Sequence, residues 1–158
     1  MAAMSDFLEN KIIDYLFRGE AFGVTGATAG VGSGPANLYI ALCADEPTDG
    51  NTGTEITGGS YARVEVESGM GAAGWAGTNS VGSTAASTGD SGTTSNNGAI
   101  NFPSPTANWG VITHFGIYDA ATAGNLLFWG ALTTPKTVNN GDAAPAFAPS
   151  SLSIQIDN

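Results

Sequence analysis

The segment from Val111 to Leu132 constrains the fold of this chain more than any other part of its sequence. Two runs rich in β-branched and aromatic residues flank a connection of small residues, Ala120 to Asn125, and this arrangement is typical of a β-hairpin. Successive side chains of a strand point to opposite faces of a sheet, and neither face of these runs is polar. We therefore expect both faces to be covered, one by a second sheet of the protein and the other by another molecule.

Shorter strand patterns occur on both sides of this hairpin. They lie at residues 38–43, 61–67, 99–102 and 152–156. Along 61–67 we expect Ala62, Val64 and Val66 to face inward, while Arg63 and its alternate neighbours face solvent. Strands and helices do not alternate along the chain, which argues against a parallel sheet. The sequence predicts one mainly β domain over residues 1–158, an antiparallel β-sandwich of jelly-roll-like kind with one N-terminal amphipathic α-helix.

Residues 5–19 predict that helix. Ser5 or Asp6 can cap its start, and Asp6 with Glu9 has the spacing of a capping box. Gly19 is suited to its end. Apolar residues follow one helical face at Leu8, Ile12, Tyr15 and Leu16. Ile13 and Phe17 widen this apolar face. Two roles are open for the helix: packing on the edge of the sandwich, or anchoring the protein to a neighbour in an assembly.

Residues 68–98 consist mainly of Gly, Ala, Ser and Thr, and Trp75 is their one aromatic residue. A structureless segment of this length is unusual within a compact domain. We expect an excursion that carries one or two short strands, with Trp75 as its packing anchor.

Composition and charge exclude several classes of function. Acidic residues outnumber basic ones by 14 to 4, and the resulting net charge of −10 opposes binding to a phosphate backbone, so we expect no nucleic-acid partner. The single cysteine, Cys43, permits no internal disulfide, and one Cys with one His cannot complete a zinc site. No apolar run approaches the ~20 residues of a membrane helix, and the N-terminus does not resemble a signal peptide.

No segment predicts an active site, and we expect no cofactor. His114 lies mid-strand without a partner motif for general-base chemistry, and Cys43 lies among aliphatic residues. Glu65 and Glu67 are spaced roughly 7 Å apart along a strand, which suits a glycosidase pair but also any solvent-facing strand. The acidic loop 45–51 has oxygen ligands for calcium, although its spacing favours a solvated turn.

Several segments together resemble a known family. These are SDFLENKIIDYLFRG, NLYIALCADEPTD, GTEITGGSYARVEV and NNGAINFPSPTANWGVITHFGIYDAATAGNLLFWGALTTPKTVNNGD. Their order is similar to that of the small virion proteins of tailed phages known as tail or collar fibre proteins. The resemblance covers most of the chain and excludes residues 23–34 and 69–91, which look like insertions.

The resemblance implies a non-enzymatic structural component of a tailed-phage virion, assembled in the cytoplasm of the bacterial host. It leaves open a capsid decoration (cement) protein and a collar or tail fibre-type protein. The chain has no heptads or fibrous repeats, so we expect a compact knob and not a shaft. Expected partners are further copies of the protein and other virion proteins, of capsid, collar or tail. Candidate contact residues are Phe7, Ile12, Tyr15, Leu16, Phe115, Tyr118, Phe128 and Trp129.

Two alternatives belong to other classes. A carbohydrate- or receptor-binding module of the adsorption apparatus would stack sugar rings on exposed Tyr61, Trp75 or Trp109. A depolymerase would depend on Glu65 and Glu67 alone.

Overall fold

A computed structural model describes residues 4–22, 37–78 and 85–156 of the chain. Residues 23–34, which the resemblance excludes, and residues 79–84 of the predicted excursion lie outside this range. The chain divides into two compact units. One contains Met1–Asn37, Glu67–Ala99 and Phe147–Asn158, and the other contains Leu38–Val66 and Ile100–Ala146.

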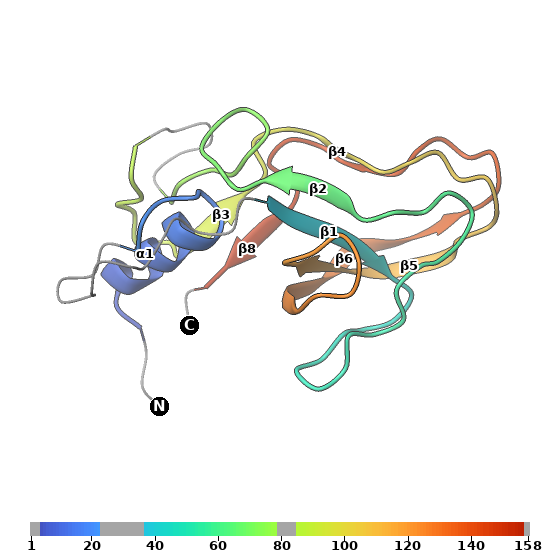
Figure 1. The fold of residues 1–158 in the computed structure, drawn as a ribbon, viewed down its shortest axis with the longest axis horizontal. Helices are drawn as coiled ribbons and strands as arrows, with labels where there is room; N and C mark the ends of the chain where they lie inside the picture. The colour runs from blue at the N-terminus through green and yellow to red at the C-terminus, as the bar shows by residue number, and fades with distance from the viewer. Residues whose placement is uncertain (1–3, 23–36, 79–84, 157–158) are drawn as a thin grey trace. The chain divides into compact units, whose positions relative to one another are not determined.

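The first unit holds the helix, α1 (Asp6–Leu16), and an antiparallel pair, β3 (Thr93–Ser95) with β8 (Ser153–Gln155) (Figure 1). Its core contains Phe17 and Trp75, whose rings meet edge to face with centroids 4.8 Å apart. Trp75 is 0% exposed, which confirms its role as the packing anchor of the excursion. In the predicted last strand, where Leu152, Ile154 and Ile156 are expected to face inward, Leu152 and Ile154 are buried and Ile156 is half-buried.

The two ends of α1 have different determinants. Ser5 occupies the N-cap, and its backbone carbonyl accepts hydrogen bonds from Leu8 and Glu9. Ser5 is thus the N-cap, one of the two predicted positions, but its side chain makes no capping bond. At the other end Gly19 has φ +68°, and a Cβ there would lie 2.9 Å from the Ser68 carbonyl oxygen. Glycine is therefore required where the chain leaves the helix.

The second unit is organised by a four-stranded antiparallel sheet in the order β2-β1-β5-β6. Its strands are β1 (Asn37–Cys43), β2 (Val64–Glu67), β5 (Gly110–Tyr118) and β6 (Leu126–Val138). β1 and β5 pair from Tyr39 opposite Tyr118 to Cys43 opposite His114. Residues 40–43 and 115–118 are all buried, so both faces of these stretches of the two central strands are covered within one chain. This corrects the expectation that a second molecule is needed to cover the second half of β5.

β5 and β6 form the predicted hairpin, with an irregular second strand. Ile112 pairs with Lys136 whereas His114 pairs with Ala131, so β6 contains extra residues at this point. Pro135 lies within that stretch, where a residue without a backbone N–H causes no loss to the ladder. β6 forms an edge of the sheet, and most of its residues are exposed or half-buried.

A short pair, β4 (Ile100–Asn101) with β7 (Ala146–Phe147), completes the described strands. Most of the regular structure is therefore antiparallel strand with one short N-terminal helix, which confirms the predicted fold class. Among the described residues no helix is long and apolar enough to cross a membrane.

The predicted strand 61–67 is correct in its second half only. β2 begins at Val64, and Val66 is buried while Glu65 and Glu67 are exposed. Ala62 is exposed, not inward, and the side chain of Arg63 is largely buried. Alternation fails there because Arg63 is drawn into a network of hydrogen bonds described below.

Candidate functional site

The helix buries a polar face and leaves much of its apolar face accessible. Glu9, Asn10 and Asp14 are buried beside Ile13. Phe7 is 57% exposed, and the predicted contact residues Ile12, Tyr15 and Leu16 are half-buried. An amphipathic helix normally turns its apolar stripe toward its own core. We call the residues Phe7, Leu8, Ile12, Tyr15 and Leu16 the α1 stripe.

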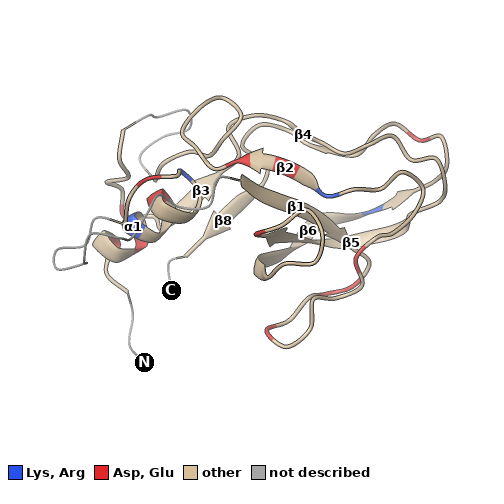
Figure 2. Ribbon diagram, viewed as in Figure 1, with Lys and Arg blue, Asp and Glu red and all other residues tan. Residues whose placement is uncertain are grey.

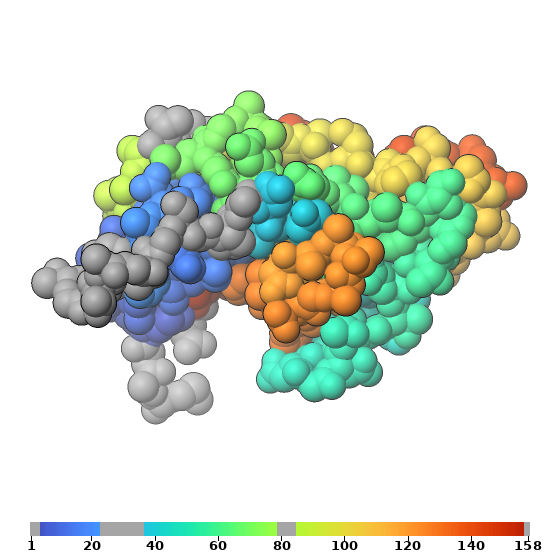
Figure 3. Space-filling model, viewed as in Figure 1, coloured from blue at the N-terminus to red at the C-terminus, as the bar shows by residue number. Residues whose placement is uncertain are grey.

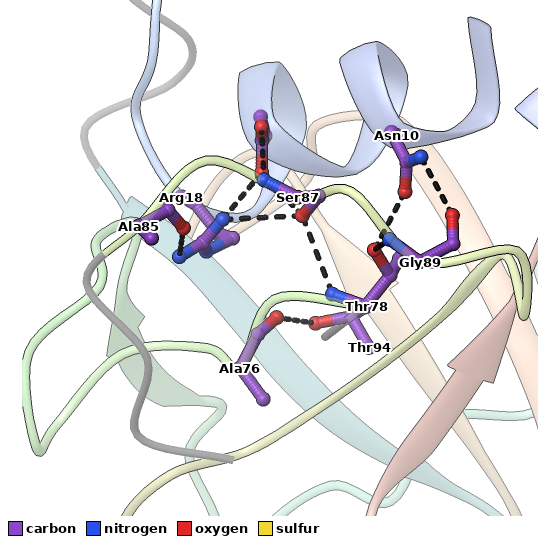
Figure 4. Close-up of polar contacts among 9 residues, drawn as sticks. Asn10, Arg18, Ala76, Thr78, Ala85, Ser87, Gly89 and Thr94 are labelled. Carbon is purple, nitrogen blue, oxygen red and sulfur yellow. Dashed lines mark hydrogen bonds and ion pairs between the residues drawn. The ribbon is translucent and has the colours of Figure 1, made fainter. Parts of the chain in front are cut away.

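A buried ion pair holds the C-terminal half of α1 (Figure 4). The Nη1 of Arg18 lies 2.5 Å from the Oδ1 of Asp14, one helical turn earlier, and both residues are buried. Asp14 also accepts hydrogen bonds from the backbone N–H and the hydroxyl of Ser87, at 2.9 and 2.6 Å. Arg18 donates to the Ala85 carbonyl at 2.6 Å. Charged groups buried in this way are stable only because each is paired and hydrogen-bonded.

A second cluster holds the N-terminal half. Asn10 donates to the Gly89 carbonyl at 2.7 Å and accepts from the Thr78 hydroxyl at 2.6 Å (Figure 4). The Gly89 backbone N–H donates to the same hydroxyl at 3.0 Å. The two clusters fix the rotation of α1 about its axis, because both use its polar face. The α1 stripe is on the remaining surface.

The four predicted contact residues of the hairpin have different environments. Phe115 and Tyr118 are buried, Phe128 is half-buried, and Trp129 is 36% exposed. Phe115 and Tyr118 therefore belong to the core of the second unit, and Trp129 is the most accessible of the four.

An arginine network under the hairpin turn was missed by the sequence analysis. Arg63 makes a bidentate ion pair with Glu55, with Nε and Nη2 at 2.9 and 2.7 Å from the two carboxylate oxygens. Its Nη1 donates to the carbonyls of Ala120 and Ala123, each at 2.8 Å. Burial lowers the pKa of Arg63, but the hydrogen bonds and charge of Glu55 more than offset it, so the net pKa is raised. Arg63 therefore fixes the turn between β5 and β6 through the carbonyls of Ala120 and Ala123.

Tyr61 extends the same network. Its hydroxyl donates to Glu55 at 3.0 Å and accepts from the backbone N–H of Leu42 at 2.9 Å. Burial is the largest cause of its raised pKa, so the phenol stays protonated. The sequence signal for this network was an arginine next to Tyr61 and the acidic residues Glu55 and Glu65, and such a pattern is also typical of an exposed strand.

The turn that Arg63 holds also forms part of a groove of about 460 Å³. Its walls are the loop that follows β1, at residues 48–52, and the start of β6 with its turn, at residues 124–127 and Trp129. The loop, teal in Figure 3, lies beside the turn, which is orange. Figure 2 shows acidic residues along the segment between β1 and β2 that contains this loop.

The aromatic residues predicted for sugar stacking are not exposed. Trp75 and Trp109 are buried, and the indole N–H of Trp109 donates to the Gly59 carbonyl at 2.9 Å. Tyr61 is half-buried with its hydroxyl in the arginine network. These three residues cannot provide an open stacking surface.

The candidate catalytic groups are not assembled into a site. Cys43 and His114 face each other across β1 and β5, a proximity that the sequence did not reveal. Burial, followed by the charges of Glu55 and Asp45, raises the pKa of Cys43 to about 11, so its thiol is not an activated nucleophile. His114 shares a 2.8 Å hydrogen bond with the Thr113 hydroxyl.

The predicted acidic loop uses its first carboxylate internally. Asp45 accepts from the Thr54 hydroxyl at 2.7 Å and from the Thr54 backbone N–H. The pKa of Asp45 is lowered by these two bonds, the side-chain bond having the larger effect. Within the described ranges, no group of three or more His, Cys, Asp or Glu side chains could hold a metal ion.

Comparison with known proteins identifies the family. The model of the family described as Podophage GP4 fiber I protein gp80 matches residues 3–155. No curated protein matches the chain. Because the family match spans nearly all 158 residues, the chain belongs to this family of phage tail-fibre proteins.

Proposed function

We propose that this protein is a non-enzymatic structural component of the tail-fibre apparatus, present in several copies, and that it contacts its neighbours in the virion through the α1 stripe. The family supports a place in the virion and a structural role. A collar position and capsid decoration are the alternatives, and the copy number per particle separates them, since capsid decoration follows the capsid lattice.

The observation that carries this proposal is the orientation of α1. The helix buries Asn10 and Asp14, held by the contacts of Figure 4, and leaves Phe7 as the most exposed large apolar residue of the described chain. Burying carboxylates and amides is costly unless each finds a partner, so a helix that does so while exposing phenylalanine is oriented for an external contact. Aromatic anchors of this kind dominate the energetics of many interfaces.

The partner is proposed to be a second copy of the chain or another virion protein. Phe7→Asp tests this, because it places a charge at the centre of the proposed contact. We expect the variant to retain its β circular dichroism, to sediment at a lower mass than the wild type, and to be lost from purified particles.

Val111→Asp is the matched control, because Val111 is 50% exposed and lies in the other unit. We expect it to assemble normally. Normal assembly of Phe7→Asp would exclude the α1 stripe as the contact. Loss of assembly in both variants would show that added charge alone is harmful.

A further inference from the structure

We propose that the groove between the loop at residues 48–52 and the start of β6 receives an arginine side chain of another virion protein. The arginine is carried by an extended segment that pairs with the free edge of β6. This site is independent of the α1 stripe, because all of its residues lie in the second unit. Its volume of about 460 Å³ is within the range of small-ligand sites, about 300–1,000 Å³, so a long side chain fits in it.

The start of β6 is suited to pairing with an extended segment. Among the described strands of its sheet, β6 has a neighbour on one side alone. The unpaired backbone groups of such an edge accept an added strand unless charge or proline prevents it. Pro135 and Lys136 prevent it near the end of β6, whereas residues 126–131 contain no proline and no charge. The opposite edge, β2, carries the exposed Glu65 and Glu67. Residues 126–131 are therefore the edge segment open to strand addition.

The position of Trp129 determines which side chain of the added strand enters the groove. Trp129 lies opposite Gly116 on β5, and a Cβ at Gly116 would lie 2.9 Å from the Tyr118 ring on the same face of the sheet. The Tyr118 hydroxyl donates to the Thr52 carbonyl at 3.4 Å, so the loop at residues 48–52 covers this face. Directly opposite residues of paired strands have Cβ atoms about 4.5–5.5 Å apart. A side chain opposite Trp129 on the added strand therefore lies against the indole ring.

The charge of the groove selects a cationic side chain. None of its lining residues is basic, and Asp49 is acidic. Among the described residues, ion pairs join Arg18 to Asp14 and Arg63 to Glu55, and Asp49 takes part in neither. An acidic side chain would be repelled, and an apolar one would cover the carboxylate without giving it a partner. The net charge of −10 also attracts a basic partner.

The two groups that the groove offers favour arginine over lysine. A guanidinium is planar, so it can stack on an indole ring and donate two parallel hydrogen bonds to a carboxylate, whereas the ammonium of lysine is a point charge. The second unit already contains this arrangement, because Arg63 covers the Tyr118 ring and forms a bidentate pair with Glu55. Trp129 and Asp49 offer an aromatic ring and a carboxylate to an arginine from outside.

The walls of the groove are fixed before the partner arrives. The backbones of Thr48 and Asn51 bond each other twice, at 2.7 and 3.1 Å. Asn125 donates from its backbone and its side chain to the two carboxylate oxygens of Asp119, each at 2.7 Å. Arg63 holds the same turn through two carbonyls. Preorganisation of this kind lowers the entropic cost of binding.

The test uses the full chain and the capped pentapeptide TVRVT, with affinity measured by isothermal titration calorimetry. Labelling with ¹⁵N-tryptophan gives three indole N–H resonances, and that of Trp129 is the one missing from Trp129→Leu. We expect the peptide to shift this resonance. The same peptide with citrulline, a neutral side chain of similar shape, should bind about tenfold or more weakly. Acetyl-arginine methylamide, which cannot form a strand, should also bind more weakly.

Two variants test the residues of the groove. Asp49→Asn and Trp129→Leu should each weaken binding of TVRVT by about tenfold, while circular dichroism stays that of the wild type. Glu46→Gln is the matched control, because it removes the same charge from the same segment outside the groove lining, and its affinity should stay within about twofold of wild type.

Four results would each overturn the proposal. The first is no binding of TVRVT at millimolar concentration, and the second is equal affinity for the citrulline peptide. The third is unchanged affinity in Asp49→Asn. The fourth is tighter binding of spermidine than of TVRVT, which would assign the groove to a free polyamine and not to a protein segment.

Discussion

The guanidinium carbon of Arg63 lies 3.6 Å from the centroid of the Tyr118 ring, so that an ion-paired cation covers the last aromatic residue of β5. Cation–π contacts gain strength when the groups are shielded from water, and here the arginine side chain is largely buried. The same guanidinium bonds the carbonyls of the hairpin turn. One side chain therefore covers the sheet and positions one wall of the Trp129 groove.

Removing this arginine should destabilise the second unit. Arg63→Ala leaves the Glu55 carboxylate and two turn carbonyls without their donor, and we expect the free energy of unfolding to fall by about 2–4 kcal/mol. Urea denaturation followed by circular dichroism measures the change. Lys136→Ala, an exposed position on β6, is the control and should stay within about 0.5 kcal/mol of wild type. A neutral Arg63→Ala would mean that the network contributes little to stability.

The buried pair on α1 gives a second prediction, in the other unit. Asp14→Ala removes the carboxylate that compensates the buried charge of Arg18 and bonds Ser87 twice, and should cost about 3–5 kcal/mol. Amide hydrogen exchange should show loss of protection across α1. Asp6→Ala removes an exposed carboxylate from the first turn of the same helix and should cost less than about 1 kcal/mol. Equal effects of the two variants would contradict a specific role for the pair.

The hairpin turn should depend on pH through Asp119. The side-chain hydrogen bond from Asn125, followed by that from the Asn125 backbone, lowers the pKa of Asp119 below its ordinary value. Because the folded-state pKa is the lower one, this stabilisation is complete above the unfolded-state pKa of about 3.9 and is lost as the pH falls through the folded-state value. Carboxyl carbon NMR titration should show the low midpoint, and Asn125→Ala should move it upward. An ordinary midpoint in the wild type would contradict the two bonds.

Cys43 should be unreactive until the protein unfolds. With a pKa of about 11, raised chiefly by burial, only about a thousandth of the thiol is ionised at pH 8. Reaction with Ellman's reagent should be slow in buffer and fast in urea, and the signal is unambiguous because the chain has one cysteine. Fast reaction under native conditions would show that the sheet around Cys43, where β1 pairs with β5, opens readily.

The sequence alone determined the mainly antiparallel fold and several of its elements. Alternating apolar residues located β1 and β8, the doubly apolar runs located β5 and β6, and the small-residue connection located their turn. Trp75 was identified as a packing anchor because a lone large apolar side chain in a polar segment has few alternatives to burial. The family resemblance was carried by four segments of the sequence, and the family match confirms it.

Tertiary structure alone decided which face of α1 is buried. Its apolar spacing placed Ile12 and Tyr15 on one face but left open whether that face packs on the protein or contacts a neighbour. Asp14 and Asn10 are buried because Ser87, Thr78 and Gly89 provide their hydrogen bonds. Those partners lie about 70 or more residues away in the sequence. A polar residue becomes an interior one only when such partners meet it, and a local pattern carries no information about them.

The groove, too, is formed by residues that are distant in the sequence and could not be predicted from a local pattern. Trp129 and the loop at residues 48–52 are far apart in the sequence, and they meet because β1 pairs with β5 and β5 with β6. Periodicity determined that Trp129 is on a strand, but strand order determined that this strand is at the edge of the sheet. Most residues of β1, in the interior of the sheet, are buried, whereas most residues of β6 are exposed or half-buried.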